Sequence, residues 1–112
     1  MIEQSLIEHL EACLVVSAYA EQPGTVDGRY IVLERTGGTA RCGIRHATIA
    51  VQSYADSMTD AAQLCNEVIE AMERLTEYND VSACSLTNYY NFTDTSQRKY
   101  RYQAVFEITY YE

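Results

Sequence analysis

The feature that most constrains the fold is an alternation of apolar and mostly polar side chains over Lys99–Tyr111. A period of two residues places one set on each face of an extended strand. One face of this strand is almost wholly apolar, so we expect other elements of the chain to cover it. The apolar set is Tyr100, Tyr102, Ala104, Phe106, Ile108 and Tyr110, and the other set is Arg101, Gln103, Val105, Glu107, Thr109 and Tyr111.

Two amphipathic helices are predicted, one at the start of the sequence and one in the middle. In the first, Ile2, Leu6 and Leu10 recur at helical spacing, and Cys13 or Leu14 continues the stripe. In the second, a longer apolar stripe lies opposite charged and amide side chains. Its members are Ala61, Leu64, Cys65, Val68, Met72 and Leu75.

The start of the second helix carries a capping signal. Ser57 is followed three residues later by Asp60, and this spacing fits a capping box. Asp56 offers an alternative cap one residue earlier. Either cap sets negative charge against the positive end of the helix, so the carboxylates at this junction are explained without catalysis.

The remaining segments are predicted to form strands joined by turns. Residues 29–35 are rich in β-branched and aromatic side chains, and Thr36–Thr39, with its two glycines, predicts a hairpin turn. The order of elements predicts one domain, residues 1–112, of the α+β class, with a mainly antiparallel sheet of four to five strands and two helices packed on one face. Further strands are expected at 15–20, 41–54, 81–89 and 99–111, with a loop at 21–28 and a hairpin tip at 91–98.

The net charge of −8 is unevenly distributed along the chain. Acidic residues lie mainly on the predicted helices, whereas basic residues gather in the two predicted hairpins. Such acidity argues against ordinary binding to a phosphate backbone. The stretch RKYRY, residues 98–102, leaves two further interpretations open: a clamp for single-stranded nucleic acid, or an edge strand guarded by positive charge.

The four cysteines, Cys13, Cys42, Cys65 and Cys84, never form a C-x-x-C pair, so no zinc site is predicted. We expect reduced thiols, with Cys13 and Cys65 on apolar helix faces. The first residues show neither a basic start nor an uninterrupted apolar run, so no signal peptide is predicted. No stretch of about 18 apolar residues occurs, so no membrane span is expected.

No group of residues in the sequence predicts catalysis. The two histidines, His9 and His46, have no neighbours that complete a site, although a Cys–His pair between residues remote in sequence stays open. The phosphate-binding and hydrolase motifs G-x-x-x-x-G-K-[ST], G-x-G-x-x-G and G-x-S-x-G do not occur. We therefore predict a protein that is not an enzyme and has no catalytic, cofactor-binding or metal-ligating residues.

Three stretches carry a resemblance to a known family: GRYIVLERTGGT (28–39), HATIAVQSYADSMTDAAQLCNEVIEAMERL (46–75) and YQAVFEITYYE (102–112). Their pattern resembles the tail terminator, tail completion and head-to-tail joining proteins of long-tailed bacteriophages and prophages. The likeness covers nearly the whole chain, and it is one of hydrophobic pattern and element order.

The resemblance implies a structural role in the virion, after assembly in the cytoplasm of the bacterial host. A ring, commonly of six copies, would cap the tail tube, stop its growth and join it to the head, and DNA would pass through without specific binding. No cofactor or catalytic residue is implied. Partners would be further copies, tail-tube proteins and head-connector proteins. A neck or minor capsid protein is the neighbouring alternative, and a small non-enzymatic binding or regulatory α+β domain is the other.

The charge pattern supplies a separate expectation about assembly. In a head-to-tail ring each copy offers two different surfaces, so an acidic helical side would match basic hairpins around the circle. The residues expected at this interface are Arg29, Arg35, Arg41, Arg45, Arg98, Lys99 and Arg101.

Overall fold

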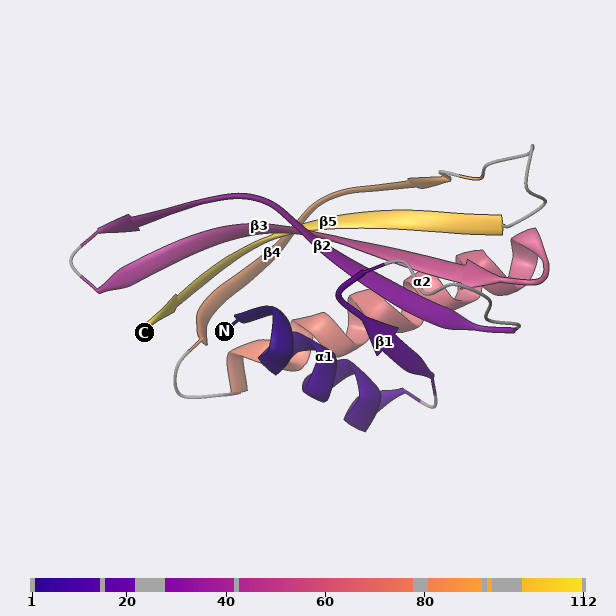
Figure 1. Cartoon of the computed structure of the whole chain (residues 1–112), viewed down its shortest axis with the longest axis horizontal. Helices are drawn as coiled ribbons and strands as arrows, with labels where there is room; N and C mark the ends of the chain where they lie inside the picture. Colours follow the sequence, from indigo (N-terminus) through magenta and orange to yellow (C-terminus); the bar gives the residue numbers. More distant parts are fainter. Residues whose placement is uncertain are drawn as a thin grey trace.

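The computed structural model describes residues 2–14, 16–21, 28–41, 43–77, 81–91, 93 and 100–111. These residues form two α-helices, one 3₁₀ turn and five strands (Figure 1). In chain order the elements are α1 (Ile2–Cys13), β1 (Ser17–Tyr19), β2 (Tyr30–Arg41), β3 (Ile44–Ala55), α2 (Met58–Glu73), the 3₁₀ turn η1 (Arg74–Glu77), β4 (Val81–Asn91) and β5 (Tyr100–Tyr111).

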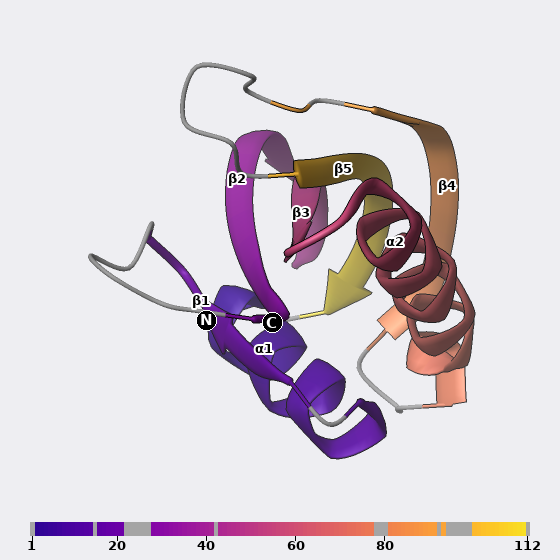
Figure 2. The ribbon, with the colours of Figure 1, turned by 90° about the vertical axis from the view of Figure 1, so that its right-hand side faces the viewer.

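The strands form a single sheet with the order β1-β2-β3-β5-β4. All neighbouring pairs are antiparallel except β1 and β2, which run parallel. The sheet is strongly twisted and curls around the helices, which lie on the same side of it (Figures 1 and 2). The predicted α+β class and the packing of the helices on the sheet are confirmed.

The core lies between the helices and the sheet. Leu6 and Leu10 of α1 and Leu64 and Val68 of α2 are fully buried, as their helical spacing predicted. Each such side chain contributes about 1.5–3 kcal/mol relative to an exposed one. On the sheet the same cluster contains Ile31, Leu33, Ala47, Ile49, Val51, Ala104, Phe106, Ile108 and Tyr110.

Ser57 is the N-cap of α2. Its backbone is extended, and its hydroxyl oxygen accepts the Asp60 backbone N–H at 3.1 Å. The capping prediction is confirmed for Ser57 rather than for Asp56. The α-helix ends at Glu73, but η1 continues the chain for one tighter turn and keeps Leu75 of the apolar stripe buried.

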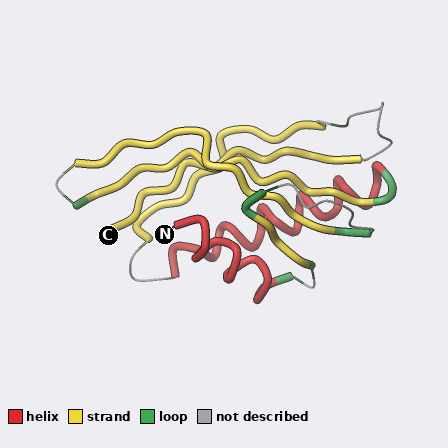
Figure 3. Tube along the Cα trace, viewed as in Figure 1, coloured by secondary structure: helices red, strands yellow, loops and turns green. Residues whose placement is uncertain are grey.

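The predicted turn at Thr36–Thr39 is wrong. Strand β2 continues through both glycines to Arg41, and the turn before β3 contains Gly43, whose φ of 80° favours glycine. The register of β2 against β3 shifts between Arg35 and Gly37, which leaves an extra residue at Thr36, a β-bulge. The long hairpin seen at one end of the molecule in Figure 3 is the result.

Gly38 serves close packing rather than a turn. A Cβ atom added there would lie 2.6 Å from Nη2 of Arg35 and 2.8 Å from the carbonyl oxygen of His46. Only glycine allows the Arg35 guanidinium and the neighbouring strand to approach this closely.

Three further expectations are corrected or refined. Cys13, expected on the apolar face of α1, is exposed, because the helix ends there and Leu14 packs against the core instead. The strand that contains Arg101 is not an edge strand, since β5 pairs with both β3 and β4. The strand expected at 15–20 is confined to Ser17–Tyr19. Most of the expected loop, residues 22–27, and most of the expected hairpin tip, residues 92 and 94–98, lie outside the described residues.

Candidate interaction surface

Within the described part of the chain, no group of three or more His, Cys, Asp or Glu side chains is placed to hold a metal ion. Burial raises the pKa of the Cys65 thiol to about 11. Burial, with a smaller contribution from the Glu73 carboxylate, raises the pKa of Cys84 to about 11 as well. Both thiols therefore stay protonated and unreactive near neutral pH.

His9 is buried between the helices. Its Nε2 donates to the carbonyl oxygen of Ala71 in α2 at 2.7 Å. The Sγ atom of Cys13 lies 3.9 Å from each of the two ring nitrogens of His9. The Cys13 thiol and the His9 imidazole therefore lie one helical turn apart on α1. Their separation is near the upper limit for a hydrogen bond that involves sulfur. The stronger bond, to Ala71, ties α1 to α2.

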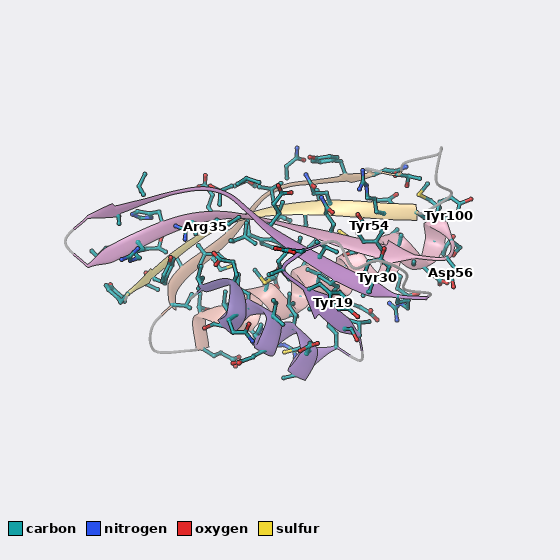
Figure 4. The ribbon with its side chains drawn as sticks, in the orientation of Figure 1. Tyr19, Tyr30, Arg35, Tyr54, Asp56 and Tyr100 are labelled. Carbon is teal, nitrogen blue, oxygen red and sulfur yellow. The ribbon has the colours of Figure 1, made fainter. Side chains whose placement is uncertain are left out.

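The face of the sheet away from the helices carries a second, smaller cluster. Tyr30 and Tyr54, directly opposite each other on β2 and β3, stack with ring centroids 4.6 Å apart. Tyr19 of β1 meets Tyr30 edge to face at 6.2 Å, and Val32 completes the cluster. Figure 4 shows the three tyrosines on neighbouring strands toward one end of the sheet. This face is therefore partly apolar and ordered rather than simply solvated.

A row of hydrogen bonds extends from this cluster across the sheet. Nη1 of Arg101 donates to the Tyr54 hydroxyl at 2.9 Å, and this hydroxyl donates to Oε1 of Gln52 at 3.1 Å. Gln52 donates to Oε1 of Gln103 at 3.0 Å, and Gln103 donates to the Tyr90 hydroxyl at 2.5 Å. The row links β3, β5 and β4, so the exposed Tyr90 is held against the sheet.

Farther along the same sheet, a shallow depression of about 360 Å³ with polar and apolar lining residues crosses four strands. Its lining includes Thr39, His46, Ser85 and Glu107, and Nδ1 of His46 lies 3.0 Å from the Thr109 hydroxyl. The lining residues that carry a hydroxyl group are Thr39, Thr48, Ser85 and Thr109.

The predicted interface residues divide into several groups. Arg29 pairs with Glu67 of α2 at 2.6 Å, and Arg35 pairs with Glu3 of α1 at 3.6 Å, so both contact helical acids within one chain. Arg101 binds Tyr54, and its guanidinium also lies over the Tyr54 ring, 5.8 Å from the centroid.

The other four predicted interface residues are Arg41, Arg45, Arg98 and Lys99. Arg45 is half-buried on β3, and Arg41 ends β2. Arg98 and Lys99 lie outside the described residues.

Sequence reasoning missed the most exposed apolar part of the sheet, the outer strand β4. This strand has eleven residues, VSACSLTNYYN, without a charge, proline or glycine. Three of its large side chains are partly exposed to solvent: Leu86 is 38% exposed, Tyr89 53% and Tyr90 39%. On its inner side β4 pairs with β5, and it is the last strand in the sheet order.

Two register shifts interrupt the pairing of β4 with β5, after Val81 and after Leu86. The hydroxyls of the two extra residues, Ser82 and Thr87, donate to the carbonyl oxygens of Thr109 and Val105 at 3.3 and 3.0 Å. These bonds hold the bulged strand on β5, and its other edge remains without a partner among the described strands. The sequence itself shows that residues 81–91 carry no charge. It does not show that they form an edge strand, because that depends on the order of the strands in the sheet.

No protein-family model matches this chain, and no curated protein matches it. In the described part of the chain, neither helix is long and apolar enough to cross a membrane.

Proposed function

We propose that this chain is a structural assembly protein that forms a ring at the end of a bacteriophage or prophage tail tube and joins the tube to the head. The observation that carries the assembly part of the proposal is the uncharged edge strand β4, with Leu86, Tyr89 and Tyr90 exposed along it. The tail-terminator part rests on the resemblance of the three sequence stretches described above.

The composition of β4 supports self-assembly because edge strands are hazardous when they are left open. Proteins that stay monomeric usually protect such strands with charge, proline, β-bulges or a covering segment, and of these β4 has the bulges at Ser82 and Thr87. Strand β4 contains neither charge nor proline. Its tyrosines offer large contact areas with a polar tip, which is typical of residues at protein interfaces. An edge of this kind is suited to being covered by another protein chain.

The charge of the chain supports a passage for DNA rather than a DNA-binding surface. A net charge of −8 repels a phosphate backbone, so DNA would pass a ring of such chains without being held. The basic residues that do exist are partly neutralised within the chain, as Arg29 is by Glu67 and Arg35 by Glu3.

The same edge favours a second candidate function. A small binding domain can receive a peptide of a different protein as an added strand, with backbone hydrogen bonds giving affinity and side-chain contacts giving specificity. In that case β4 would be covered by a partner peptide and the chain would remain a monomer by itself.

Light scattering coupled to gel filtration, followed by negative-stain microscopy, tests between the two functions. The ring proposal predicts a mass of several chains that rises with protein concentration, and closed rings in the images about as wide as a phage tail. A single-chain mass at every concentration, in both low and high salt, contradicts the ring and leaves the peptide-binding domain as the better account.

A further inference from the structure

We draw no further inference here: the strongest candidate, the outer edge of strand β4 with its partly exposed Leu86, Tyr89 and Tyr90, has no partner among the described strands and already carries the proposed assembly, and nothing in the structure shows what covers it.

Discussion

Nε2 of His9 and the carbonyl oxygen of Ala71 lie 2.7 Å apart, although the two residues are 62 positions apart in the sequence. This bond joins the middle of α1 to the last turns of α2 in a buried environment. Replacing His9 with alanine removes a side-chain hydrogen bond, worth about 0.5–1.5 kcal/mol, from a carbonyl oxygen that still accepts the Arg74 backbone N–H, and it opens a cavity as well. Urea denaturation of His9→Ala should show this loss in the free energy of unfolding. The matched change Glu8→Ala, at an exposed position of the same helix, should alter it by less than about 0.5 kcal/mol.

Gly38 and Gly37 are adjacent in sequence and should respond very differently to an added methyl group. Gly38→Ala places Cβ 2.8 Å from the His46 carbonyl oxygen, which is backbone and cannot move aside cheaply. We expect a loss of about 1–3 kcal/mol by overpacking. Gly37→Ala meets nothing within 4 Å and should cost far less, so equal thermal stability of the two variants would contradict the described close approach.

The N-cap of α2 gives a third test. Ser57→Ala removes the acceptor of the Asp60 N–H and should lower the free energy of unfolding by about 1 kcal/mol. Ser57→Asp restores an acceptor and adds a favourable charge at the positive helix end, so its stability should return to that of wild type. If alanine and aspartate behave alike at this position, the cap contributes nothing.

The cysteines should differ in reactivity by their burial. The thiolate is the reactive form of cysteine. At about pH 8, a pKa near 11 rather than 9.0 lowers the fraction of Cys65 and Cys84 present as thiolate about 100-fold. Peptide mapping after brief alkylation of the folded protein should find Cys13 modified while Cys65 and Cys84 remain intact. In urea all three should react at similar rates.

The same burial of the thiols makes stability depend on pH in the alkaline range. The pKa of Cys65 is higher in the folded chain than its ordinary value of 9.0, so the folded state holds its proton longer. Its contribution to stability is therefore complete below pH 9.0 and is lost as the pH rises through about 11. Cys65→Ala should weaken the alkaline loss, measured as the urea midpoint against pH.

Periodicity was sufficient to predict the helices, the N-cap and the apolar face of β5, because these features depend on neighbours within a few residues. The turn at Thr36–Thr39 was mispredicted because a Gly-Gly pair is typical of tight turns. The structure instead uses Gly38 for the close approach of the His46 carbonyl oxygen on the neighbouring strand β3, a cross-strand contact that the Gly-Gly pair does not reveal.

The exposed edge strand β4 could not be predicted from the sequence either, because its position depends on contacts between residues far apart in the chain. Strand β4 is an edge only because β5 returns between β3 and β4, and this order arises from long-range register such as Val51 opposite Ala104. The arginines were predicted as a group from charge alone. The structure pairs Arg29 and Arg35 with helical acids of the same chain, at distances that sequence separation does not reveal.

Hydrogen exchange of the β4 backbone amides, measured in dilute and in concentrated protein, tests the central claim most directly. If the open edge of β4 is where copies meet, amides of residues 81–91 that exchange freely in the dilute chain become protected as the mass rises, and Tyr89→Lys abolishes this change. Assembly that leaves the exchange of β4 unaltered would contradict the account.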